Sequence, residues 1–152
     1  MSMVFLMPYG EVAAERIEVE REFTKTRKRQ KIWLCYLKYM QELGHFLKWP
    51  YFQYIDGSFI SKKTVPLDID LVTFIDYRDY AFCSDELIDL RYRFKPDVDA
   101  YLVPMYPPDH PRYELITNAG LNAWQLTFNK AVIVSRQGQN KIFKKGYIKV
   151  LT

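Results

Sequence analysis

The sequence contains few of the residues that build disulfide frameworks and zinc sites. Among its 152 residues are two cysteines, Cys35 and Cys83, and two histidines, His45 and His110. Their positions do not match the close spacing of zinc ligands. Two cysteines so far apart are typical of reduced thiols in a cytosolic protein, not of a secreted scaffold held by disulfides. The sequence therefore predicts no structural zinc site and a cytoplasmic location.

The sequence also lacks long apolar runs. The N-terminal stretch, MSMVFLMPYGEV, has no basic region before its short apolar run, and Pro8 and Gly10 interrupt it. A transmembrane helix needs about 20 consecutive, mostly apolar residues, and the sequence offers no such stretch. We therefore expect neither a signal peptide nor a membrane partner.

Apolar and aromatic residues, in contrast, are plentiful. Hydrophobic residues make up 49% of the chain and aromatic residues 16%. At this length they suffice to enclose a core, so we expect a single domain over residues 1–152. The aromatic rings either pack in the core or stack on bases, and their number alone does not decide between the two. The net charge of +4 mildly favours anionic partners such as nucleotides or RNA.

The pattern along the chain predicts an α+β fold, with a helical part at residues 1–48 and a sheet-containing core at residues 49–152. Helical spacing predicts helices at Glu11–Phe23 and Thr26–Lys48, the second capped by Thr24 or Thr26. Apolar or alternating runs predict strands at Tyr51–Ile55, Asp68–Ile75, Pro96–Val103 and Gly146–Leu151. The remaining expectations are a polar turn at Asp76–Asp79, a short helix at Asp85–Leu90, a rigid loop at Pro104–Pro111, helical structure at Tyr113–Asn129 and a loop at Arg136–Lys145.

The segment Tyr54–Ile75 carries the residues most typical of a catalytic site. Gly57 and Ser58 are followed by nine residues and then by Asp68 and Asp70, which open an apolar run. Residues two apart on a strand point to the same face, so both carboxylates should project together. Two such carboxylates repel each other unless a cation lies between them, and Mg²⁺ or Mn²⁺ suits hard oxygen ligands. The alternative is a turn residue followed by a surface carboxylate.

This pattern resembles the signature of the nucleotidyltransferase superfamily that includes DNA polymerase beta. With the lead FLMPYG, the segment VDAYLVPMYPP and the closing KGYIKV, the chain is similar over most of its length to an uncharacterised family of small bacterial proteins. Those proteins are related to the minimal nucleotidyltransferases of toxin–antitoxin systems. The resemblance implies a small mixed sheet flanked by helices. It also implies metal-dependent transfer of a nucleoside monophosphate, with AMP from ATP expected, to a protein or RNA acceptor.

The resemblance also implies which residues would form the site. Asp68, Asp70 and a third carboxylate from a neighbouring strand would bind Mg²⁺ or Mn²⁺, and the third would help to deprotonate an acceptor hydroxyl. Asp99, between two apolar residues, matches that third position, and Asp97 is the fallback because it lies on the same face of the predicted strand. For either of these, a structural ion pair with a nearby arginine is the alternative.

The turn and the loop after it are expected to hold the nucleotide. Gly57 and Ser58 would seat the triphosphate, because glycine allows close approach of a ligand and backbone N–H groups at a helix start bind anions. Lys62 or Lys63 would help to neutralise the phosphates, unless both are simply exposed loop lysines.

Two other functional classes compete with the enzyme. One is a catalytically inactive protein of the same fold that binds a partner protein or RNA, as one half of a toxin–antitoxin or phage-defence pair. The other is a plain RNA-binding module. This module would use a basic cluster at the start of the second predicted helix to bind phosphates. The alternative is that the cluster is simply a solvated helix end, although cations at that end oppose the helix macrodipole. The cluster comprises Lys25, Arg27, Lys28, Arg29 and Lys31.

Overall fold

A five-stranded mixed sheet dominates the described part of the chain. The computed structural model describes residues 10–61, 63–134, 137–138, 140–144 and 146–151. The elements are, in order, β1 (Gly10–Glu15), α1 (Arg16–Phe23), α2 (Arg27–Phe46), β2 (Phe52–Asp56), a 3₁₀ turn (Ser58–Ile60), β3 (Ile69–Asp76), α3 (Tyr77–Arg93), β4 (Val98–Met105), a π-helical turn (Tyr113–Asn118), α4 (Ala119–Phe128), β5 (Lys130–Val134), β6 (Asn140–Lys144) and β7 (Gly146–Leu151). The predicted α+β class is confirmed.

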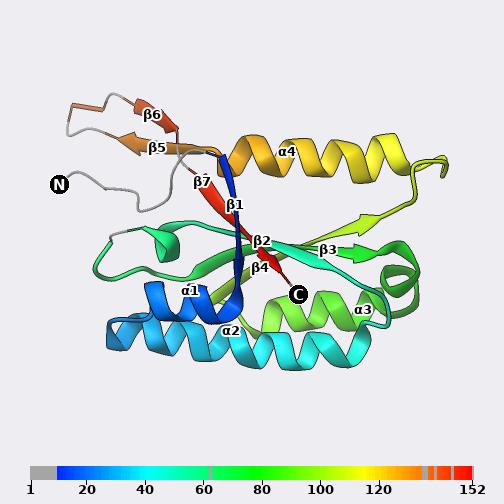
Figure 1. The fold of residues 1–152 in the computed structure, drawn as a ribbon, viewed down its shortest axis with the longest axis horizontal. Helices are drawn as coiled ribbons and strands as arrows, with labels where there is room; N and C mark the ends of the chain where they lie inside the picture. Colours follow the sequence, from blue (N-terminus) through cyan, green and yellow to red (C-terminus); the bar gives the residue numbers. More distant parts are fainter. Residues whose placement is uncertain (1–9, 62, 135–136, 139, 145, 152) are drawn as a thin grey trace.

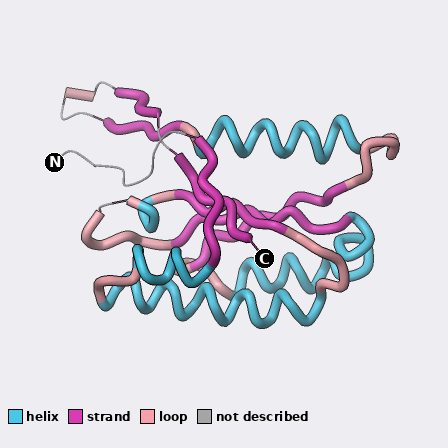
Figure 2. Tube along the Cα trace, viewed as in Figure 1, coloured by secondary structure: helices cyan, strands magenta, loops and turns pink. Residues whose placement is uncertain are grey.

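The strand order in the sheet is β1-β7-β2-β3-β4, which places β1 and β4 at the two edges (Figures 1 and 2). β1 pairs with β7 in parallel and β3 with β4 in parallel, whereas β2 is antiparallel to both β3 and β7. β5 and β6 form a separate antiparallel pair. The parallel register of β3 and β4 sets Asp70 directly opposite Asp99.

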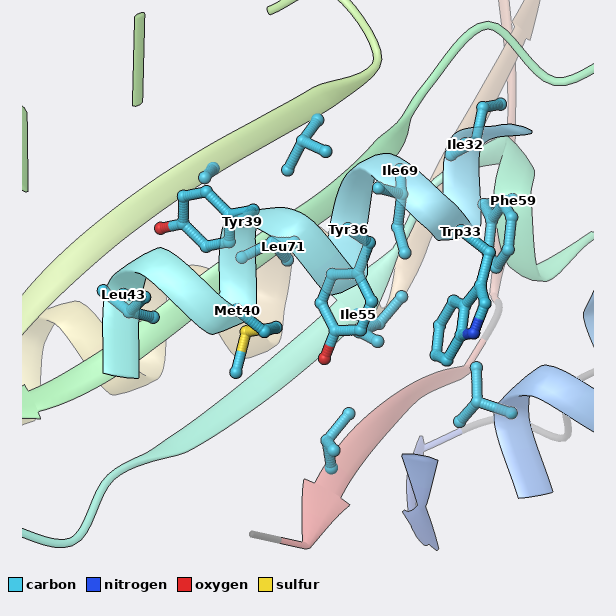
Figure 3. Packing of buried hydrophobic residues seen from close by; sticks show 14 of the residues in the cluster. Ile32, Trp33, Tyr36, Tyr39, Met40, Leu43, Ile55, Phe59, Ile69 and Leu71 are labelled. Atoms are coloured by element: carbon cyan, nitrogen blue, oxygen red, sulfur yellow. The ribbon is translucent and has the colours of Figure 1, made fainter. Parts of the chain in front are cut away.

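Helices cover both faces of the sheet. Helices α1, α2 and α3 lie together on one face, and α4 lies on the other (Figure 1). The core beneath α2 is a continuous buried cluster, in which Tyr36, Tyr39 and Leu43 pack against Ile55 and Leu71 of the sheet (Figure 3). The core beneath α4 is smaller and is built mainly from aromatic rings, including Phe74, Phe128 and Tyr147.

Helix α2 confirms the helix predicted at Thr26–Lys48. Its buried residues recur at helical spacing, and the Thr26 side chain caps its start by accepting a hydrogen bond from the Arg29 N–H at 3.3 Å. Thr26, rather than Thr24, is thus the N-cap. The strands predicted at Tyr51–Ile55, Asp68–Ile75 and Pro96–Val103 correspond to β2, β3 and β4, with ends shifted by one or two residues, and the strand predicted at Gly146–Leu151 has the bounds of β7.

The prediction for Glu11–Phe23 is wrong in its first half. Gly10–Glu15 is strand β1, and the helix begins only at Arg16. Alanine and glutamate favour a helix locally, but pairing with β7 along the full length of β1 overrides that preference. The N-terminal part of the chain is therefore not purely helical, because it supplies one edge of the sheet.

Three further predictions are corrected. Asp76–Asp79 is not a turn: the Asp76 side chain accepts a hydrogen bond from the Arg78 N–H at 2.9 Å and starts α3, which kinks at Cys83 and continues through the predicted Asp85–Leu90 helix. The segment predicted as a loop at Arg136–Lys145 contains β6. The loop predicted at Pro104–Pro111 begins two residues too early, because Pro104 and Met105 belong to β4, where the sheet edge tolerates a proline. No helix among the described residues is long and apolar enough to cross a bilayer.

Candidate metal centre

Three carboxylates meet where β3 and β4 begin. Asp68 immediately precedes β3, Asp70 is its second residue, and Asp99 is the second residue of β4. One carboxylate oxygen from each lies within 4.8 Å of the other two. Because β3 and β4 are parallel neighbours in register, this convergence follows from the sheet itself. A spacing of this kind suits oxygen coordination of one or two divalent cations.

The three carboxylates lie on the α4 side of the sheet. Two positions after Asp70 comes Val72, and four positions after Asp99 comes Val103. Both valines belong to the aromatic core cluster beneath α4. The strand alternation therefore directs Asp70 and Asp99 to that face, at the end of the sheet where β3 and β4 start.

The electrostatics of the cluster are unfavourable without a cation. Burial, followed by the charges of Asp68 and Asp99, raises the pKa of Asp70 to about 7. Burial and then Asp99 also raise the pKa of Asp68, while the Lys63 ammonium opposes part of that rise. Asp99 Oδ1 is buried, and within the described part of the chain it has no hydrogen-bond partner. An oxygen in this position is available as a metal ligand, so the residues present fit a divalent ion.

Asp99 has two further contacts on its outer side. The Tyr101 hydroxyl donates a hydrogen bond to Asp99 Oδ2 at 3.3 Å, and Lys95 Nζ lies 3.9 Å from Asp99 Oδ1. The Tyr101 ring packs on Trp124 of α4, with a centroid separation of 4.9 Å, and the Arg91 guanidinium lies 4.3 Å from its centroid. Tyr101 thus links the carboxylate cluster to α4.

Asp97, the fallback for the third position, is engaged elsewhere. Lys28 Nζ lies 4.0 Å from Asp97 Oδ1, and the Cys35 thiol donates to Asp97 Oδ2 at 3.6 Å. Both partners belong to α2, on the opposite face of the sheet from α4. The geometry therefore brings Asp99, and not Asp97, into the group with Asp68 and Asp70.

The Gly-Ser turn lies against this cluster. Gly57 has φ 83° and ψ −164°, a conformation that favours glycine. A Cβ atom at this position would collide with Asp70 Oδ2 and would lie 2.9 Å from Asp70 Cγ. The backbone at Gly57 therefore approaches the Asp70 carboxylate more closely than any side chain would permit. Ser58 follows directly and begins the short 3₁₀ turn.

The large residues after Ser58 do not obstruct the turn. Phe59 and Ile60 are buried in the core beneath α2, and the Phe59 ring stacks on Trp33 with a centroid separation of 6.0 Å (Figure 3). Of the two predicted lysines, Lys63 is partly buried and close enough to Asp68 to affect its pKa. Lys62 lies outside the described residues.

Arg29 organises the loop after the turn, a role that sequence reasoning missed. Its guanidinium is buried and donates hydrogen bonds to the carbonyls of Ser61 and Lys63, both at 2.7 Å. Longer bonds reach Ser58 and Phe23, and Phe59 accepts another. The basic cluster at the start of α2 is thus divided: Arg29 points inward as an anchor, while Arg27 and Lys31 are exposed. Neither of the two predicted interpretations of the cluster describes Arg29.

The histidines lie away from the carboxylates. His110 packs on Tyr77 and Tyr106, with centroid separations of 5.5 and 4.5 Å, beyond the opposite ends of β3 and β4. His45 is exposed near the end of α2.

A family model matches nearly the whole chain, over residues 2–151. The chain belongs to the DUF6932 family. This family is described as one of unknown function. Neither the curated proteins nor the solved structures contain a match to the chain.

Proposed function

We propose that this DUF6932 protein is a metal-dependent nucleotidyltransferase, which moves a nucleoside monophosphate from a nucleoside triphosphate, with ATP as the first candidate, to a hydroxyl group of a protein or RNA acceptor. The observation that carries the proposal is the convergence of Asp68, Asp70 and Asp99 beside the Gly57 backbone. An acidic cluster alone would fit many roles. Its combination with a glycine turn that admits no side chain matches the superfamily signature.

Each residue has a physical task in this proposal. Asp68 and Asp70 would hold Mg²⁺ or Mn²⁺, and a divalent ion there supplies charge stabilisation for the α-phosphate and the leaving pyrophosphate. Asp99 would share the site, and its carboxylate would accept the proton of an acceptor hydroxyl. Gly57 and Ser58 present their backbone to the triphosphate, and Lys63, with Lys62 beside it in sequence, adds positive charge. The resemblance to toxin–antitoxin relatives extends the proposal to an acceptor within such a pair or a phage-defence pair.

Calorimetric titration tests the site. ATP with Mg²⁺ should bind the wild type with metal dependence, and Asp68→Asn/Asp70→Asn should lose that binding while remaining folded by circular dichroism. Asp85→Asn/Asp109→Asn is the matched control, because it removes two exposed carboxylates far from the cluster in sequence. A folded wild type that binds no nucleoside triphosphate would refute the enzyme and favour the partner-binding protein.

Labelled nucleotide then tests the chemistry. Label on the α-phosphate of ATP should appear on an acceptor in cell extract, and label on the γ-phosphate should leave with pyrophosphate. Transfer of the γ label instead would identify a phosphotransferase. Transfer that survives in Asp99→Asn at the wild-type rate would remove Asp99 from the proposed site.

A further inference from the structure

Helix α2 has a cationic outer face. Arg27, Lys31 and Lys38 are exposed, and Lys28 is partly buried beside them. At 100° per residue Arg27, Lys31 and Lys38 fall on the side of the helix opposite the buried core residues, and Lys28 lies at the boundary between the two sides. The first acidic residue of the helix is Glu42, in its last two turns, so no carboxylate within α2 balances the four cations along its first twelve residues.

These cations do not stabilise the helix that carries them. The first turn of α2 contains no acidic residue, and cations near a helix N-terminus oppose the macrodipole. Among the described residues, no carboxylate lies within ion-pair distance of Arg27, Lys31 or Lys38, and Lys28 contacts only Asp97. The positive electrostatic potential of this face therefore extends into solvent, where it attracts anionic groups.

The cationic face leads to the carboxylate cluster. The turn before β4 packs on α2 through the contacts of Lys28 and Cys35 with Asp97. Asp97 is close enough to Asp68 to add to the rise in its pKa, after burial and Asp99. Lys95, in the same turn, lies 3.9 Å from Asp99. A polyanion that follows α2 would thus pass the edge of the sheet at β4 and reach the three carboxylates.

An exposed aromatic ring lies on this route. Tyr92, at the end of α3, is 64% exposed, and Lys95 Nζ lies 5.8 Å from its ring centroid. Exposed rings beside lysines are the usual elements of single-stranded nucleic acid binding, because bases stack on the rings and phosphates pair with the cations. An acidic protein segment would use the lysines but would have no comparable use for the ring.

We propose that the outer face of α2, with Tyr92 and Lys95, binds the phosphate backbone of a single-stranded nucleic acid and leads its end to the carboxylate cluster. The second part of this proposal, that the end of the strand reaches the carboxylates, rests on the proposed nucleotidyltransferase function. In that case the nucleic acid would be the acceptor of the transferred nucleotide. The binding itself needs neither a metal nor a nucleotide, so it can be measured independently of catalysis.

The test uses fluorescence anisotropy of a short labelled single strand of mixed sequence, as RNA and as DNA, with EDTA present. Lys28→Gln/Lys31→Gln/Lys38→Gln removes three of the four cations of the face, and Arg16→Gln/Arg21→Gln/Lys48→Gln is the control, since it removes three exposed cations elsewhere. We expect the first variant to bind about tenfold or more weakly, with the slope of log affinity against log salt reduced by about 2. The control should change binding by less than about threefold. Tyr92→Ala should weaken it by about fivefold or more, through lost stacking.

Each outcome decides the question. No binding of either strand by the folded wild type, or equal losses in the two triple variants, would overturn the proposal. Binding of polyglutamate as tight as that of the single strand, with no effect of Tyr92→Ala, would also overturn it and would indicate an acidic protein partner. A preference for RNA over DNA, or the reverse, would identify which nucleic acid is bound. Loss of ATP binding in the Asp68→Asn/Asp70→Asn variant is a separate result and leaves this measurement intact.

Discussion

At the scale of single residues, Gly57 is the position where the backbone is most constrained by the site. Its φ of 83° disfavours any side chain, and a Cβ atom would collide with the Asp70 carboxylate. Gly138 has a similar φ of 76°, but a Cβ atom there would meet nothing within 4 Å. Substitutions at the two glycines therefore distinguish two costs: the strain of a positive φ, which both share, and the steric clash with Asp70, which only Gly57 has.

We expect Gly57→Ala to lower the free energy of unfolding by about 2–4 kcal/mol and to abolish nucleotide binding, whereas Gly138→Ala should cost about 1 kcal/mol and leave binding unchanged. Urea unfolding and calorimetric titration measure the two effects. Equal destabilisation by the two substitutions would contradict the close approach of the Gly57 backbone to Asp70.

Asp70 should reduce the stability of the metal-free protein. Its pKa is raised from 3.8 to about 7, chiefly by burial and then by the two neighbouring carboxylates. A carboxylate whose folded pKa is raised binds its proton more tightly in the folded state, so stability is lost as pH rises from about 4 to about 7. In EDTA at pH 8, Asp70→Asn should therefore be more stable than the wild type by about 2 kcal/mol, and the difference should shrink toward pH 4.

Thermal unfolding across that pH range measures the difference, with Asp109→Asn as an exposed control. A destabilised Asp70→Asn at pH 8 would mean that the carboxylate is compensated by interactions other than a metal.

At the scale of elements, the loop that follows the Gly57 turn depends on an arginine of α2, which lies 29 to 34 positions earlier in the sequence than the carbonyls it binds. Arg29 of α2 holds the carbonyls of Ser58, Phe59, Ser61 and Lys63, so the loop takes its shape from that guanidinium. Removing the cation would leave several buried carbonyls without a donor. We expect Arg29→Met to lower the free energy of unfolding by about 3 kcal/mol and to expose the loop to proteolysis.

Arg27→Met is the matched control, because Arg27 is exposed on the same turn of α2. Limited proteolysis with mass spectrometry locates the cleavage, and urea unfolding measures the stability. Cleavage that begins elsewhere in Arg29→Met would contradict the anchoring role.

The same elements show how far the sequence alone could lead. Strand periodicity is local, so residue spacing alone predicts that Asp68 and Asp70 share a face. The choice of Asp99 as their partner, and of Gly57 beside them, rests on the resemblance to the superfamily, because the parallel pairing of β3 with β4 leaves no trace in residue spacing. The role of Arg29 could not be predicted in this way, because no pattern in the neighbouring sequence indicates that its guanidinium binds five backbone carbonyls. The residues of β1 predict a helix because they have helical propensity, and only pairing with β7, more than 130 residues later, makes them a strand.

At the scale of the whole molecule, the carboxylate cluster should couple the proposed metal binding to folding. The three carboxylates come from two strands that are brought together only in the folded sheet, so a divalent ion should bind the native state and not the unfolded chain. Such binding raises stability with ligand concentration, by about 2.7 kcal/mol at a hundredfold excess over Kd. Mn²⁺ or Mg²⁺ should therefore raise the unfolding temperature of the wild type by several degrees, and EDTA should reverse the rise.

Differential scanning calorimetry measures this shift in the wild type, in Asp68→Asn/Asp70→Asn, in Asp99→Asn and in Asp97→Asn. The double variant should lose the response, because it lacks two of the three ligands. Asp97→Asn should keep it, because Asp97 is held by Lys28 and Cys35 on the other face of the sheet. If the metal response is lost in Asp97→Asn but kept in Asp99→Asn, the third metal ligand is Asp97 and not Asp99. The same response in every variant would place the metal elsewhere on the molecule.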